Sequence, residues 1–385
     1  MRTASEKSFL VFSGGNDRAI IGFLRALRLC GKRAHVIART KDDRILRSGF
    51  RRDVKWVRPT HDLSLEIFSE SVRRARADAG EAMLVVLPST EYFNTFLLCH
   101  RREIEEMGCQ IPLVQASLYA QLTEKRSAAD FFSTAGLAVP HEISVPETCK
   151  PPVVAKPLRN VSAAGQSLYP HLLHTRAELE AFFATRDAKD YFFQEYVRGD
   201  SLYLLFHLSR TEGHDFTWSQ HNLLQQPDGK SMLLAEPSDF HGSETAARLV
   251  RALRNAGFHG LGMVEVIRAA DRDVFIEMNP RIWGPVQFCL DQQRPLLQAF
   301  IGEALHDDPR RFADSRPRLR RKRYFWLGGL LETLRAGKRP AWHTASRALF
   351  PVILRNLASD VYLRKDSWRC FLHDVFRASQ GRSTR

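Results

Sequence analysis

Two runs of β-forming residues around a short polar connection constrain the fold of this chain more than any other feature. The runs cover residues 263–268 and 274–281, and together they predict an antiparallel hairpin. Glu265 and Glu277 are each six residues from Asp271. A turn centred on Asp271 therefore places the two glutamates directly opposite each other on neighbouring strands.

Opposed glutamates in such a hairpin need a partner. Directly opposed side chains lie about 5 Å apart, and like charges repel at that distance. Both glutamates stand among Val, Ile, Met and Phe, where an unpaired carboxylate is costly to bury. A divalent cation removes both penalties. The alternative, a hairpin whose glutamates face solvent, stays open, because a slip of one residue in register produces it.

The residues that follow Glu277 add ligands of the same kind. Asn279 is two positions further along the strand, so it faces the same side and offers a third oxygen. Oxygen ligands in small number suit Mg²⁺ better than Zn²⁺. Arg281, again two positions on, is expected to act as an anion clamp at this site.

The start of the chain predicts a parallel sheet. Four segments indicate strand, glycine turn, helix and strand in turn: residues 8–12, 13–17, 18–30 and 34–38. This order forms a βαβ unit. A further strand at residues 83–87 ends in Pro88-Ser89-Thr90-Glu91, at the edge where open α/β sheets place ligands. We expect an N-terminal α/β domain over residues 1–115.

After residue 116 the pattern changes to a mixture of helices and antiparallel strands. Helices are expected at residues 122–136 and 245–257, and strands at 153–157, 191–197, 202–208 and 216–224, before the hairpin. The predicted domain covers residues 116–310, with subdomains of about 116–190 and 191–310. Residues 311–385 are expected to form a basic helical extension.

Four segments of this region, in chain order, resemble the nucleotide-binding motifs of one superfamily. They are Leu122-Thr123-Glu124-Lys125, Pro152–Pro157, Gln194–Asp200 and the hairpin with Phe275–Arg281. Their residues and order resemble the ATP-grasp superfamily, in particular its shorter carboxylate–amine ligases, which have the ATP-binding fold of carbamoyl phosphate synthase. The resemblance implies a parallel α/β pre-ATP-grasp domain, then an ATP-grasp domain of two subdomains.

The resemblance also implies ligands for each matched residue. Lys125 and Lys156 are expected to contact the ATP phosphates, and a loop with Ser162 and Gly165 to close over the β- and γ-phosphates. The residues implied to hold adenine and ribose are Gln194, Glu195, Tyr196, Val197 and Asp200. The residues implied to hold Mg²⁺, with Mn²⁺ as an alternative, are Glu265, Glu277 and Asn279.

Arg281 and Lys230 are the residues implied to steady the transferring phosphoryl group. Lys230 belongs to the segment 225–231, which resembles a basic Pro-Gly-Gly loop of the ligases. Here glutamines replace the usual arginines, and Lys230 replaces the second glycine. The phosphate loop is also poorer in glycine than in many relatives. The identity of the substrate is therefore not carried over.

The implied reaction has two steps. A substrate carboxylate attacks the γ-phosphate of ATP to give an acyl phosphate and ADP, and an amine then displaces phosphate to form an amide. The expected partners are a small-molecule or glycan carboxylate and an amine, neither of which the sequence names. No nucleic acid is expected, and an oligomer is left open.

Two other functions stay open. Ser13-Gly14-Gly15-Asn16-Asp17 after a strand resembles the pyrophosphate loop of enzymes that adenylylate substrates, although Arg18 stands where they usually have Ser or Thr. Such an enzyme releases AMP and pyrophosphate instead of ADP. The second alternative is a non-catalytic nucleotide-binding protein that docks to a membrane or an anionic partner through its basic tail.

Charge and cysteine content bear on the surroundings of the protein. Of the net charge of +14, residues 316–385 hold 17 Lys and Arg against 4 Asp and Glu, so nearly all the excess lies in the tail. We interpret this tail as a helical cap, with peripheral membrane contact through residues 316–385 left open. The six cysteines are scattered, which is typical of a reducing cytoplasm. No secretory signal and no apolar run of about 18 residues is recognised.

Overall fold

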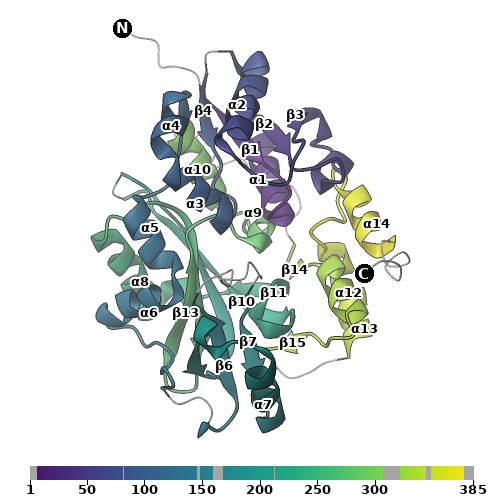
Figure 1. Cartoon of the computed structure of the whole chain (residues 1–385). Coiled ribbons are helices and arrows are strands. Elements are labelled where there is room, and N and C mark those ends of the chain that lie inside the picture. The colour runs from purple at the N-terminus through teal and green to yellow at the C-terminus, as the bar shows by residue number, and fades with distance from the viewer. Residues whose placement is uncertain are drawn as a thin grey trace.

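The computed structural model describes residues 7–80, 82–144, 148–158, 168–211, 213–306, 321–343 and 348–376. These residues form a parallel sheet, a large antiparallel sheet and a small antiparallel sheet, all flanked by helices. In Figure 1 the N-terminal domain lies at the top, the two antiparallel sheets lie below it, and the C-terminal helices stand along one side.

The N-terminal domain is built on a five-stranded sheet of order β3-β2-β1-β4-β5, and all of its pairings are parallel. Its strands are β1 (Lys7–Phe12), β2 (Ala34–Ala38), β3 (Val54–Val57), β4 (Met83–Val86) and β5 (Cys109–Gln110). Its helices are α1 (Asp17–Leu29), α2 (Leu65–Ala79), α3 (Glu91–Cys99) and α4 (Arg101–Glu106), with 3-10 turns η1 (Arg44–Arg47) and η2 (Arg51–Asp53). The parallel α/β prediction is confirmed.

Alternating side chains of β1 pack into two separate hydrophobic cores. Phe9 and Val11 pack with α1 on one face of the sheet, whereas Leu10 and Phe12 pack with α2, α3 and α4 on the other. The turn between β1 and α1 requires glycine at position 14. Its φ is +89°, and a Cβ there would lie 2.3 Å from the Cβ of Arg39.

The small sheet has the order β7-β6-β8 and packs against α7 (Arg176–Thr185). Its strands are β6 (Val153–Pro157), β7 (His171–Leu173) and β8 (Tyr191–Glu195). Because β8 pairs with β6, this sheet runs on to Glu195, past the subdomain boundary expected near residue 190. The domain limits at residues 115 and 310 stay predictions.

The large sheet has the order β13-β12-β9-β10-β11-β14, with β15 added to β10. Its strands are β9 (Asp200–Leu208), β10 (Phe216–Gln225), β11 (Met232–Ser238), β12 (Gly260–Arg268), β13 (Asp273–Asn279), β14 (Tyr324–Phe325) and β15 (Ala341–Trp342). The helices of this region are α5 (Ala116–Thr123), α6 (Lys125–Thr134), α8 (Glu244–Asn255), α9 (Gln287–Asp291) and α10 (Leu296–Leu305). Further 3-10 turns are η4 (Ala188–Asp190), η5 (Pro227–Gly229), η6 (Phe240–Gly242) and η7 (Gly284–Val286).

The helix expected over residues 122–136 is wrong as a single element. The chain leaves the helical conformation at Glu124, whose ψ is 125°, and two helices meet there. The Glu124 side chain accepts hydrogen bonds from the backbone N–H groups of Arg126 and Ser127, so it caps the second helix. Helices α5, α6 and α8 cover one face of the large sheet.

The C-terminal segment packs as part of the body. Its helices are α12 (Leu327–Arg335), α13 (Leu349–Asn356) and α14 (Trp368–Phe376), with the 3-10 turn η8 (Leu357–Ser359). The expected helical character is confirmed, but the two short strands β14 and β15 were not expected. Figure 1 shows α14 beside the N-terminal domain, where Asp366 and Asp374 pair with Arg25 and Arg44. Within the described ranges, no helix combines the length and apolarity needed to cross a bilayer.

Candidate active site

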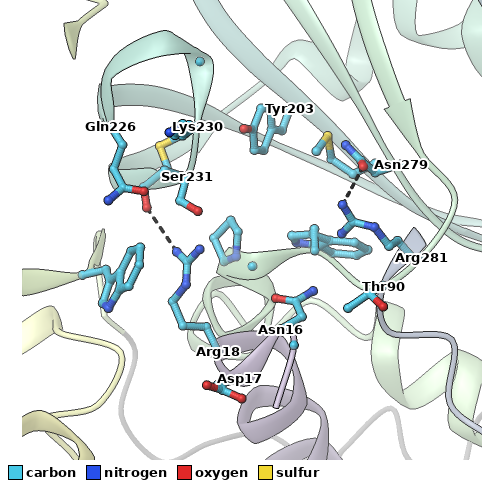
Figure 2. Close-up of a pocket in the computed structure, with 18 of the residues that line it drawn as sticks. Asn16, Asp17, Arg18, Thr90, Tyr203, Gln226, Lys230, Ser231, Asn279 and Arg281 are labelled. Atoms are coloured by element: carbon cyan, nitrogen blue, oxygen red, sulfur yellow. Dashed lines mark hydrogen bonds between the residues drawn. The ribbon is translucent and has the colours of Figure 1, made fainter. Parts of the chain in front are cut away.

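A cavity of about 760 Å³ lies where the N-terminal domain, the large sheet and the C-terminal segment meet. Figure 2 shows side chains from all three parts pointing into it. The strand ends of the parallel sheet contribute Gly15, Asn16 and Thr90, as expected for ligand-binding loops of an α/β sheet. The large sheet contributes Tyr203, Glu277, Asn279 and Arg281, and the C-terminal segment contributes Trp326, Glu332 and Tyr362.

The two glutamates of the hairpin face each other. Glu265 of β12 is the register partner of Glu277 of β13. The turn itself is centred between Ala270 and Asp271, since Arg268 pairs with Asp273. A β-bulge between Glu265 and Val266 shifts the register and restores the opposed pair. The predicted facing geometry is therefore confirmed, although the path of the backbone to it differs.

Glu265 is the buried member of the pair, with 7% of its surface exposed. Burial and the nearby charge of Glu277 raise the pKa of Glu265 to about 8, against the hydrogen bond from Ser201 and the charge of Lys156. Ser201 Oγ donates to Glu265 Oε1 at 2.7 Å and itself accepts from Asn222 Nδ2 at 2.7 Å. This polar chain fixes the Glu265 carboxylate toward Glu277.

Glu277, Asn279 and Arg281 form a second polar chain along β13 and the residues after it. Asn279 Nδ2 donates to Glu277 Oε1 at 2.8 Å, and Arg281 Nη2 donates to Asn279 Oδ1 at 2.7 Å. Figure 2 shows Arg281 and Asn279 together at the wall of the cavity. The expected alignment on one face is thus present, and Asn279 links the Arg281 guanidinium to the Glu277 carboxylate.

Lys156 of β6 brings a positive charge from the small sheet to the same place. Its Nζ donates to the carbonyl oxygen of Ile276, next to Glu277, at 3.2 Å. Burial lowers the pKa of Lys156 to about 8, although Glu277 and Glu265 act in the opposite direction. Lys125 at the start of α6 lowers the Lys156 pKa further by repulsion. The two lysines therefore lie close enough to interact, next to the two glutamates.

The donor set suits a hard cation. It consists of two carboxylates and one amide, each of which offers an oxygen ligand. One of the carboxylates, that of Glu265, is buried. Among the described residues, no three His, Cys, Asp or Glu side chains gather as a metal site. A cation at Glu265, Glu277 and Asn279 would need the amide oxygen as its third protein ligand, as Mg²⁺ accepts.

Other residues implied to bind nucleotide are placed less centrally. Glu195 pairs with Arg272 at 3.2 Å in a separate hollow that Gln194 also lines. Tyr196 packs edge-on against His174 with ring centroids 5.5 Å apart, and Val197 follows it in the same loop. Asp200, at the start of β9, lies 3.6 Å from His221 Nε2. Ser162 and Gly165 lie outside the described residues.

Lys230 lines the cavity from the loop between β10 and β11. Its Nζ lies 4.8 Å from the centroid of the Tyr169 ring, in a cation–π contact. The backbone of the loop is held because Gln225 Nε2 donates to the Lys230 carbonyl at 2.7 Å. Lys230 and Arg281 thus stand on the wall of one cavity (Figure 2).

The structure adds an arginine and a tryptophan that sequence reasoning did not assign to the site. Arg18, at the start of α1, stacks on Trp326 with its guanidinium carbon 3.8 Å from the ring centroid. Its Nη1 also donates to the Tyr324 hydroxyl at 2.9 Å and to the Met232 carbonyl at 3.2 Å. The strand-end turn before Arg18 was a sequence signal for the arginine, whereas nothing local marked Trp326.

Comparison with known proteins bears on the fold. No protein-family model matches this chain, and no curated protein matches its sequence. A biotin carboxylase from Campylobacter jejuni matches with a TM-score of 0.55 and 15% identity, over 77% of this chain and 70% of that chain. A second match is the biotin carboxylase domain of 2-oxoglutarate carboxylase from Hydrogenobacter thermophilus, in complex with MgADP, ADP and bicarbonate. It has a TM-score of 0.55 and 15% identity, over 82% of this chain and 71% of that chain.

A third solved structure is N5-carboxyaminoimidazole synthetase from Staphylococcus aureus in complex with ADP. It matches with a TM-score of 0.58 and 12% identity, over 80% of each chain. Identities this low concern the fold alone. The likeness covers the parallel N-terminal sheet and the antiparallel sheets together. The chain therefore has the fold of ATP-grasp enzymes, which it shares with biotin carboxylase and N5-carboxyaminoimidazole synthetase over about 80% of its length.

Proposed function

We propose that this protein is an ATP- and Mg²⁺-dependent ligase that activates a substrate carboxylate as an acyl phosphate and joins it to an amine. ADP and phosphate are the other products. The observation that carries the proposal is the opposed pair of Glu265 and Glu277 with Lys156 next to it. Of this group Glu277 reaches the large cavity, where Asn279 and Arg281 join it in the lining. The fold shared with ADP-bound structures supports a nucleotide in this position.

In this proposal ATP lies between the small and the large sheet. Lys156 and Lys125 face its phosphates, and the segment from Gln194 to Asp200 holds adenine and ribose. Mg²⁺ held by Glu265, Glu277 and Asn279 would supply neutralisation of the charge that develops on the β- and γ-phosphates. The hydrogen bond from Ser201 keeps Glu265 aimed at the metal position.

The reaction needs no side-chain nucleophile. A carboxylate oxygen of the substrate bonds to the γ-phosphorus, and the bond from that phosphorus to the β–γ bridging oxygen breaks, releasing ADP. The amine nitrogen then bonds to the acyl carbon, the bond from that carbon to the phosphate oxygen breaks, and the nitrogen loses a proton. Arg281 and Lys230 bind the transferring phosphoryl group and hold the carboxylate in line with it.

The far end of the cavity is proposed to receive the two substrates. Arg18 offers a guanidinium whose plane is fixed by the Trp326 ring and by Tyr324. Glu332 lines the same end and offers a carboxylate. A substrate with an anionic group and a flat or apolar body fits the stacked pair, and an amine fits the acidic side chain.

Adenylylation through the turn at residues 13–17 receives less support. Ser13 Oγ donates to Asp43 Oδ2 at 2.6 Å, and the Gly14 carbonyl accepts from Arg39 at 2.9 Å. Both groups thus hold the turn in place and are not turned toward a ligand. Gly15 nevertheless lines the cavity. The two reactions are therefore distinguished by their products, ADP and phosphate for the ligase and AMP and pyrophosphate for adenylylation.

The deciding experiment is a product assay with candidate substrates. Purified protein, ATP and Mg²⁺ are incubated with amino acids, uronic acids or small peptides, alone and in pairs, and nucleotides are separated by anion-exchange chromatography. The proposal predicts ADP and phosphate that appear only with a carboxylate present. Glu277→Ala serves as the blank, and Lys156→Ala is expected chiefly to weaken nucleotide binding. AMP with pyrophosphate as products would replace the ligase by the adenylylating alternative.

A further inference from the structure

A second hollow, of about 450 Å³, lies between the N-terminal domain and the start of α14 and shares no lining residue with the large cavity. Seven of its lining side chains are cationic: Arg28, Arg33, Arg47, Arg51, Arg52, Lys365 and Arg369. Two carboxylates, Asp53 and Asp366, also line it. Most of the cations come from α1, η1 and η2, so this concentration of charge is not confined to the basic tail.

The two carboxylates do not neutralise the hollow. Asp366 pairs with Arg25 at 2.7 Å, and Asp53 pairs with Arg28 at 3.2 Å. In the part of the chain that the structure describes, Arg51, Arg52 and Lys365 form no ion pair, and all three are exposed. Cations brought together without counter-charges repel one another, so the hollow favours an anionic ligand.

Exposed apolar side chains adjoin the cations. Trp368, which lines the hollow, is 46% exposed, and Arg369 lies over its ring at 5.3 Å. Leu372, one helical turn along α14, is also exposed, while Cys370 on another side of this helix is buried in the core. Large apolar groups in water next to cations need an explanation.

We propose that the basic–aromatic surface, formed by the seven cations of the hollow with Trp368 and Leu372, docks on an anionic lipid bilayer. Clustered Lys and Arg bind the headgroups of acidic lipids, and each cation strengthens binding roughly fivefold. Tryptophan beside them prefers the interface between headgroups and acyl chains, where Leu372 also leaves water. A nucleic-acid backbone matches the charges equally well but offers no apolar phase for Leu372.

The test is sedimentation of the full chain with vesicles. Phosphatidylcholine vesicles are compared with vesicles that also contain phosphatidylglycerol, at low and high salt. We expect binding only to the anionic vesicles, a loss at high salt, and a decrease of at least about tenfold in partitioning for the Arg51→Glu and Arg52→Glu double variant. Arg102→Glu and Arg176→Glu, on α4 and α7 away from α14 (Figure 1), change the same charge and are expected to retain binding.

A spectroscopic arm keeps the proposal testable if a variant folds poorly. Brominated lipids quench tryptophan that enters the bilayer, so anionic vesicles carrying them should quench the wild-type protein, and Trp368→Phe should remove that quenching while still binding. Equal binding to neutral vesicles, unchanged binding of the Arg51 and Arg52 variant, or quenching that persists without Trp368 would overturn the proposal. So would binding of a DNA duplex, in place of vesicles, that this variant abolishes. None of these outcomes depends on the ligase activity.

Discussion

Replacement of Arg25 by methionine tests whether the C-terminal segment is an integral part of the body. Arg25 of α1 is 9% exposed and binds Asp366 through two nitrogens, Nε at 2.9 Å and Nη2 at 2.7 Å. It also donates to Gln287 Oε1 at 2.8 Å and to Ser367 Oγ at 2.6 Å. Burial by itself would raise the pKa of Asp366, but the bonds and charge of Arg25 lower it below the usual value.

Arg25→Met keeps the apolar stem and removes every one of these donors. Breaking a buried pair by removal of one partner costs about 3–5 kcal/mol, because the other charge is left without compensation. Urea unfolding followed by tryptophan fluorescence measures this loss. Arg102→Met is the matched control, since Arg102 is 88% exposed and its pair with Glu106 should contribute less than about 1 kcal/mol. A loss below about 1 kcal/mol for Arg25→Met would refute the docked arrangement.

Three further predictions concern pH, backbone conformation and substrate selection. Burial would raise the pKa of Glu303, but hydrogen bonds from His207 and a backbone N–H lower this pKa from 4.5 to about 2. The ionised carboxylate therefore contributes about 3 kcal/mol to folding stability above pH 4.5, and this contribution is lost as the pH falls toward 2. Glu303→Gln should flatten this part of a pH–stability curve. Gly14→Ala should lower the thermal midpoint, at a cost of at least about 1 kcal/mol, because φ is +89° and Arg39 fills the space; an unchanged midpoint contradicts the strained turn. Trp326→Ala should raise the KM of a carboxylate or amine substrate about tenfold and leave the KM of ATP unchanged, whereas an effect on ATP alone would contradict its place at the substrate end.

Sequence patterns predicted those parts of the fold whose signal is local. The βαβ start and four strands of the large sheet, β9, β10, β12 and β13, follow from runs of apolar residues, and the structure has them at nearly the expected limits. Strand β11 was not expected. The helix expected at residues 122–136 is present over Lys125–Thr134, but its start was wrong, because the Glu124 side chain caps a new helix there. Strands β14 and β15 have two residues each, too short for any pattern to mark them.

The site shows the same division. Parity along one strand predicted that Glu277, Asn279 and Arg281 share a face, and their hydrogen bonds follow that order. The opposition of Glu265 and Glu277 additionally requires a β-bulge, and no residue type in the hairpin sequence predicts that bulge. Trp326 follows β14, and β14 joins the large sheet through the pairing of Phe325 with Leu234, which are 91 positions apart in the chain. Such long-range pairing cannot be derived from local periodicity.

The most direct test of the nucleotide site is the ATP affinity with and without Mg²⁺, measured by titration calorimetry. For the wild-type protein we predict that Mg²⁺ strengthens ATP binding. In Glu265→Gln and Glu277→Gln this gain should fall by at least about tenfold, since even outer-shell partners of a metal contribute that much. Glutamine variants that keep the full Mg²⁺ dependence would contradict a cation held between the two carboxylates.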